Sequence, residues 1–202
     1  MRRRGLLPLL VAALLGGATL ACSSRDGREL PSPRVPQTTT TPSADVIQPS
    51  DGSVDPFELT SPSFADGAEI PVRFTCTGES LSPALAWTGT PADASSLALV
   101  VRDLSAGGFV HWIVTGIDPF VQGVGEDGIP ENAVELPNGA GTTGWIPPCP
   151  PAGSGVHTYE LAVLALLDLV DLPLDTPAEQ AASTLETAAV ERAVITGTAT
   201  GP

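Results

Sequence analysis

The segment from Ser96 to Ile117 constrains the fold more than any other part of the sequence. It consists of two apolar runs, residues 97–101 and 109–114, separated by a short connection that contains Gly107. β-Branched and aromatic residues crowd both runs, and such residues favour strands. Glycine supplies the positive φ angles that a tight connection needs. The segment therefore predicts two buried antiparallel strands joined by a turn.

Two polar residues interrupt these apolar runs, Asp103 after the first and His111 inside the second. A carboxylate or an imidazole among apolar side chains costs free energy unless it faces a partner, a cavity or water. His157, the only other histidine, opens a further apolar run, VHTYELAVLAL, in which Tyr159 follows two positions later. The pattern therefore predicts one pocket lined by these four side chains.

The rest of the chain contributes short strand-like segments and one helix. Residues 57–64, 70–76 and 192–197 are predicted as strands. The stretch TPAE at residues 176–179 has an N-cap threonine, a first-turn proline and a capping-box glutamate, which predicts a helix of about four turns ending near Arg192. About seven to nine short strands with one late helix are typical of a mainly β fold. We expect an antiparallel β-sandwich with a C-terminal α-helix packed at its edge.

The charge of the chain excludes one class of partner. Its 202 residues carry a formal net charge of -14, from nine Arg and 23 acidic residues. A surface this acidic repels nucleic acid at long range, so no nucleic-acid partner is expected. The length allows one full-sized domain and an unstructured arm.

The N-terminal part has the pattern of an export signal. Residues 1–21 combine three consecutive Arg with an apolar run too short to span a bilayer, and small residues follow up to Cys22. This resembles a bacterial lipoprotein signal, which implies that Cys22 is acylated and anchors the protein to the extracytoplasmic face of the cell membrane. The alternative is ordinary secretory cleavage near Ala21. Residues 22–54 are rich in Ser, Thr and Pro and predict a disordered tether, which leaves residues 55–202 as the domain.

Five sequence pieces occur in an order that is specific although each alone is weak: SPSFADGAEIPVRFTC, SLSPALAW, LALVVRD, FVHWIV and PCPPAGSGVHTY. In these pieces, over about residues 57–200, the chain resembles the phosphatidylethanolamine-binding protein family, in its bacterial Raf-kinase-inhibitor-like branch. The resemblance implies a β-sandwich with a small anion-binding pocket at one end. It assigns to that pocket Asp103, His111, His157 and Tyr159, with Pro150 and Pro151 as a wall.

Two departures from the family pattern lie next to the expected pocket. The turn after Asp103 is two residues shorter than the family's, and Pro147 stands where the family has a glycine. The first change is expected to alter the rim of the pocket and the second its mouth. Both affect the identity of the ligand more than the fold.

Cys76 and Cys149 allow two interpretations. Cys149 lies close in sequence to His157 and could act as a thiol nucleophile. In an exported domain whose third cysteine, Cys22, is acylated, a disulfide between Cys76 and Cys149 is favoured instead. A metal site of two histidines and one carboxylate is a further alternative, but those residues lack a ligand-spacing motif, and no cofactor is expected.

Together these observations predict an exported, membrane-anchored binding protein that is not an enzyme. Its ligand would be a small phosphate-bearing or zwitterionic molecule such as a phosphorylethanolamine headgroup, because imidazole and phenol groups can donate to phosphate and Asp103 can accept from an ammonium. Two alternatives stay open. One is an extracytoplasmic regulator or inhibitor of a protein partner, such as a protease or a sensor kinase. The other is a hydrolase that uses the His/Asp cluster, with or without a metal.

Overall fold

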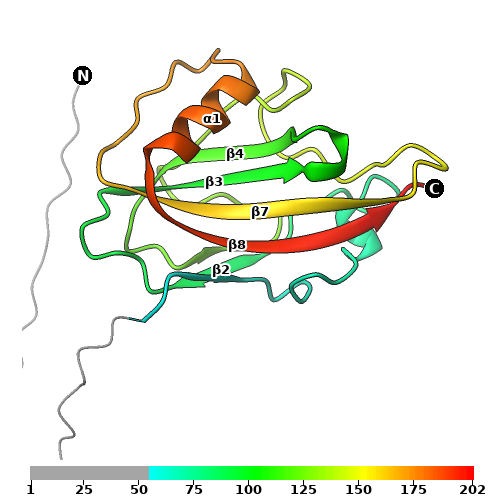
Figure 1. Cartoon of the computed structure of the whole chain (residues 1–202), viewed down its shortest axis with the longest axis horizontal. Helices are drawn as coiled ribbons and strands as arrows, with labels where there is room; N and C mark the ends of the chain where they lie inside the picture. The colour runs from blue at the N-terminus through cyan, green and yellow to red at the C-terminus, as the bar shows by residue number, and fades with distance from the viewer. Residues whose placement is uncertain (1–54) are drawn as a thin grey trace, which may run out of the picture. The chain divides into compact units, whose positions relative to one another are not determined.

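The computed structural model describes residues 55–202 as two antiparallel β-sheets and one α-helix (Figure 1). A five-stranded sheet has the order β6-β4-β3-β7-β8, and a three-stranded sheet has the order β1-β2-β5. The strands are β1 (Glu58–Thr60), β2 (Leu85–Thr88), β3 (Ser96–Asp103), β4 (Phe109–Ile117), β5 (Gly123–Val124), β6 (Val134–Glu135), β7 (Val156–Leu166) and β8 (Ala189–Thr200). The predicted mainly β class is confirmed. The export signal, Cys22 and the tether lie outside the described residues.

The central hairpin forms as predicted, and both faces of its first strand are covered. Every residue of β3 is buried. Leu97, Leu99 and Val101 face the inner core between the two sheets, whereas Ala98 and Val100 face a second core on the outer side. A strand that is buried on both faces has a continuous apolar sequence rather than an alternating one. This explains the uninterrupted apolar run at residues 97–101 of β3.

The helix α1 (Ala178–Ala188) covers the outer face of the five-stranded sheet. Its residues Ala181, Ala182 and Leu185 are fully buried in the same core as Val100 and Ile113. In Figure 1, α1 lies on one side of β3 and β4, and β2 lies on the other side of the five-stranded sheet. The helix therefore packs on a face of the sheet and not at its edge as expected. No helix within residues 55–202 has the length and apolar character needed to cross a membrane.

The predicted helix boundaries were wrong at both ends. At the start, the Thr176 hydroxyl donates to the Pro173 carbonyl, and Pro177 is the N-cap without a side-chain cap bond. The Glu179 carboxylate forms an ion pair with Arg102 at 2.7 Å instead of a capping box. At the end, β8 begins at Ala189, because pairing with β7 along almost its whole length replaces the last helical turn. Tertiary pairing overrides local propensity here.

The first two predicted strands are also shorter or absent. Residues 70–76 contain a 3-10 turn, η1 (Val72–Phe74). Phe74 is buried while Val72 is 61% exposed, although two residues at this spacing in a strand would share one face. Residues 57–64 form a strand only over Glu58–Thr60. Beyond it, the Ser61 hydroxyl donates to the Ala84 carbonyl at 2.6 Å, so a side chain takes the place of the backbone ladder.

Candidate functional site

A β-bulge in the central hairpin positions His111. Val101 pairs with Trp112 and Arg102 pairs with Val110, so His111 is the extra residue of β4 in this register. A bulge bends the strand and redirects side chains, and bulges are frequent beside functional sites. Trp112 lies in the inner core and the His111 ring contacts the Tyr159 ring, 5.2 Å between centroids, so two consecutive residues of β4 face the inner side.

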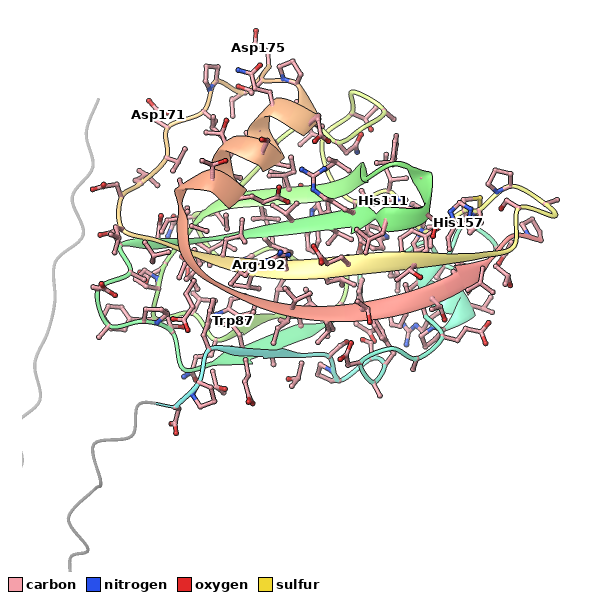
Figure 2. All side chains as sticks on the ribbon, viewed as in Figure 1. Trp87, His111, His157, Asp171, Asp175 and Arg192 are labelled. Atoms are coloured by element: carbon pink, nitrogen blue, oxygen red, sulfur yellow. A yellow bond between two sulfur atoms is a disulfide. The ribbon has the colours of Figure 1, made fainter. Side chains whose placement is uncertain are left out.

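A cavity of about 190 Å³ lies at the end of the sandwich where β3 ends and β7 begins. All six predicted site residues line it: Asp103, His111, Pro150, Pro151, His157 and Tyr159. Figure 2 shows His111 and His157 together at this end of the five-stranded sheet. A larger hollow of about 570 Å³ lies between β4 and the start of α1, but its lining contains no histidine, tyrosine or cysteine. Of these two spaces, only the smaller combines imidazole and phenol groups with a buried carboxylate.

The Asp103 carboxylate is the structural centre of the cavity. Its Oδ1 accepts hydrogen bonds from the backbone N–H groups of Ser105 at 2.8 Å and Ala106 at 3.1 Å, which close the η2 turn (Leu104–Ala106). Its Oδ2 accepts from Nδ1 of His157 at 2.7 Å. Asp103 is only 4% exposed, and these donors satisfy an anion that burial would otherwise make costly. Asp103 therefore orients His157 and the turn at the same time.

His157 is held from its other side by the proline-rich loop. Its Nε2 lies 3.1 Å from Oγ of Ser154, and the Ser154 hydroxyl donates to the Pro151 carbonyl at 2.8 Å. The order Ser154, His157, Asp103 is that of a serine-hydrolase triad. However, the serine is exposed, does not line the cavity and directs its only proton to a backbone carbonyl. The contacts attach the loop to β7.

The proton on the His111 ring can be assigned from its backbone partner. Nδ1 lies 2.8 Å from the carbonyl oxygen of Ile146. A carbonyl only accepts, so Nδ1 carries the hydrogen, and in the neutral ring Nε2 is then an acceptor. Burial lowers the pKa of His111, while the hydrogen bond to Ile146 and the Asp103 carboxylate oppose this shift. The ring packs edge-on against Phe109 and Tyr159.

Tyr159 lies directly across from Asp103 in the pairing of β3 with β7. Burial raises the pKa of its phenol well above the ordinary value, and the negative charge of the nearby Asp103 carboxylate raises the pKa further. The phenol of Tyr159 thus stays protonated at neutral pH.

The proline-rich wall is fastened to the domain at several points. Cys76 and Cys149 form the predicted disulfide, and the Cys76 N–H donates to the Pro148 carbonyl at 3.0 Å. The C-terminal backbone packs closely on the wall, because a Cβ at Gly201 would lie 2.2 Å from the Pro150 carbonyl oxygen. Pro147 lines the cavity without closing it. Because Cys149 is part of the disulfide, it has no free thiol that could act as a nucleophile.

The structure gives no support to the alternative of a metal site. Among residues 55–202, no group of three or more His, Cys, Asp or Glu side chains is arranged to bind a metal ion. Nδ1 of His111 and both ring nitrogens of His157 already have protein partners. The three candidate ligands therefore present one unengaged imidazole nitrogen between them.

Sequence reasoning missed several lining residues, among them Ala106, Phe109 and Ile146. Phe109 was accessible to reasoning, because it precedes His111 by two positions and so shares its strand face. Ile146 contributes through its carbonyl, a group that every residue has, so no sequence signal marks it.

His111 predicts a specific pH dependence of stability. The unfolded state takes up a proton near the ordinary pKa of 6.5, whereas the folded state, with a lowered pKa, takes it up only at lower pH. The unfolded state therefore binds more protons, and the free energy of unfolding falls as the pH falls from about 7 to about 5. Urea unfolding at several pH values, on wild type and on His111→Phe, would measure this. Wild type should lose more stability than the variant; parallel profiles would contradict the assignment.

Comparison with known proteins identifies the family. The family model described as phosphatidylethanolamine-binding protein matches residues 60–200. The chain belongs to the phosphatidylethanolamine-binding protein family. The protein named "Putative lipoprotein LppC" of Mycobacterium tuberculosis is 41% identical over 197 residues, covering 96% of this chain and 93% of that protein.

Solved structures of this family agree with the fold. CT736 of Chlamydia trachomatis, titled as a phosphatidylethanolamine-binding protein homologue, superposes with a TM-score of 0.66 at 31% identity and covers 72% of this chain and 98% of its own. YbcL of Escherichia coli, titled as a new member of the mammalian family, has a TM-score of 0.67 at 27% identity and covers 72% of this chain and 99% of its own. The family resemblance of the five sequence pieces is thereby confirmed.

Proposed function

We propose that this family member is an exported, membrane-anchored protein that binds a small phosphate-bearing or zwitterionic ligand, such as a phosphorylethanolamine headgroup. The observation that carries the proposal is the cavity in which Asp103, His111, His157 and Tyr159 converge. Its volume of about 190 Å³ equals roughly six water molecules at their liquid volume of about 30 Å³. Such a space suits a headgroup and not a whole lipid.

The proposed role is binding without catalysis. The only hydroxyl hydrogen of Ser154 is directed to the Pro151 carbonyl, and Ser154 lies outside the cavity lining. Cys149 is held in the disulfide. Neither potential nucleophile is therefore presented to a molecule inside the cavity.

The proposed attachment to the membrane rests on the sequence of residues 1–22 and on a relative. Cys22 follows a signal-like segment, and LppC, which this chain matches over 96% of its length, carries a lipoprotein name. Anchoring at Cys22 would hold the cavity near the lipid headgroups of the same membrane.

Calorimetric titration of phosphorylethanolamine into the purified protein tests the proposal. We expect a Kd of roughly 1 mM or tighter in wild type and a loss of about tenfold or more in His111→Phe. Phenylalanine keeps a buried ring in place and removes both ring nitrogens. The control is Asp93→Asn, an exposed residue that does not line the cavity. No binding by wild type, or equal binding by His111→Phe, would overturn the proposed function.

A further inference from the structure

A second cavity, of about 340 Å³, is lined by polar groups that the proposed headgroup site does not use. Its lining comes from the loop before β2, from Trp112 of β4, from the connection between β5 and β6, from Glu135 of β6 and from residues 144–145. The two cavities have no lining residue in common. A ligand in the second cavity would therefore touch none of the residues assigned to the headgroup site.

The half-buried Glu135 brings a carboxylate to this cavity with one oxygen engaged and the other free. Its Oε1 accepts a hydrogen bond from Nε1 of Trp112 at 2.6 Å. Its Oε2 has no hydrogen-bond partner among residues 55–202, and it is not one of the fully enclosed atoms that lack a partner. The three Arg of this range are paired with other carboxylates, namely Arg73 with Glu79 and Glu126, Arg102 with Glu179 and Glu186, and Arg192 with Glu160.

The Ser82 hydroxyl is a second free polar group at this cavity, and it is deeply buried. Ser82 lines the cavity and is only 3% exposed. Its carbonyl accepts from the Asp127 N–H at 3.1 Å, whereas its hydroxyl makes no hydrogen bond within the described part of the chain and is not fully enclosed. A hydroxyl withdrawn from bulk water costs free energy unless a partner satisfies it. Ser82 therefore points to a hydrogen-bonding molecule in the cavity.

The other lining groups define the charge and the shape of that molecule. The exposed Asp127 adds a second carboxylate, and none of the described lining residues is basic. Nε1 of Trp145 is fully enclosed, so the side chain of Trp145 can present only carbon atoms to a ligand. Among residues 55–202, no group of three or more His, Cys, Asp or Glu side chains is arranged for a metal ion. The cavity therefore suits an organic cation rather than a metal ion.

We propose that this second cavity binds a small organic cation of the guanidinium class, whose N–H groups donate to Oε2 of Glu135 and to the Ser82 hydroxyl. A guanidinium group is planar and permanently charged, it has N–H donors around its edge, and it packs its flat face on aromatic rings such as the Trp145 indole. Hydrogen bonds between such a cation and a carboxylate are stronger than those between neutral groups. The net charge of -14 also attracts cations to the protein.

Titration of methylguanidinium into the purified protein, followed by the indole N–H resonances in NMR spectra, tests the inference. The Trp112 N–H should move, because it donates to the carboxylate that binds the cation. The Trp87 N–H should stay in place, because it donates to the Val121 carbonyl and does not line the cavity. We expect a Kd of roughly 1 mM. Urea has a similar planar shape without the charge, and tetramethylammonium has the charge without N–H groups, so each should bind about tenfold or more weakly.

Glu135→Gln removes the charge and keeps a carbonyl oxygen that can accept from Trp112. This variant should bind methylguanidinium about tenfold or more weakly than wild type and should bind phosphorylethanolamine equally well. Glu131→Gln is the matched control, because Glu131 is exposed, precedes β6 and does not line the cavity. No binding of methylguanidinium by wild type would overturn the inference. Equal binding by Glu135→Gln, equal binding of urea or tetramethylammonium, or an equal shift of the Trp87 resonance would also overturn it.

Discussion

Replacing Cys76 and Cys149 together by serine is expected to lower the free energy of unfolding by about 4 kcal/mol. The disulfide joins residues separated by 73 positions. In the chain-entropy model, a crosslink that closes a loop of about this length restricts the unfolded chain by about 4 kcal/mol. Single domains are stable by only about 5–15 kcal/mol, so the loss is a large fraction of the total. The cavity should be affected as well, because Cys149 and its neighbours form its wall.

Urea unfolding followed by tryptophan fluorescence measures this effect. Chemical reduction of the wild-type protein should reproduce the change seen in the double variant, because both treatments remove the same crosslink. Ala152→Ser is a suitable control in the same loop, since Ala152 is exposed. A change below about 1 kcal/mol in the double variant would show that the unfolded chain is not appreciably restricted by the bond.

Replacing Asp103 by alanine is expected to lower the free energy of unfolding by about 3 kcal/mol and to abolish ligand binding. The substitution removes the acceptor of the Ser105 and Ala106 N–H groups and of Nδ1 of His157. A buried donor left without a partner costs about 1–3 kcal/mol, and this applies to Nδ1 of the buried His157. Ser105 and Ala106 are exposed, so water offsets part of the loss at their N–H groups.

Asp66 offers a matched control for this experiment. Its carboxylate also accepts two hydrogen bonds, from the N–H of Thr196 at 2.7 Å and from its hydroxyl at 2.9 Å, but Asp66 is exposed. Water can replace a lost acceptor there, so Asp66→Ala should cost much less than Asp103→Ala. Thermal unfolding and calorimetric titration of both variants decide the matter. Equal losses of stability would mean that burial of Asp103 does not set its contribution.

The family and the β-sandwich class could be predicted because their signals are local. The apolar runs of β3 and β4 and the turn at Gly107 are sequence patterns that depend on near neighbours only. The site residues stood out for a related reason, since Asp103, His111 and His157 are polar residues in apolar strands and each must have a partner. The predicted C-terminal end of the helix was wrong because α1 ends where β8 begins to pair with β7, and this pairing joins residues far apart in the chain.

The sequence by itself determined which chemical groups the cavity contains and on which strands they lie. The tertiary structure alone decided which atoms of those groups are free to meet a ligand. His111 is an acceptor at Nε2 because Nδ1 donates to the carbonyl of Ile146, 35 positions away. The Asp103 carboxylate accepts a hydrogen bond from His157, 54 positions away, because β7 pairs with β3. Backbone carbonyls are identical in every residue, so the partner that directs a proton is chosen by packing and has no signature in the sequence.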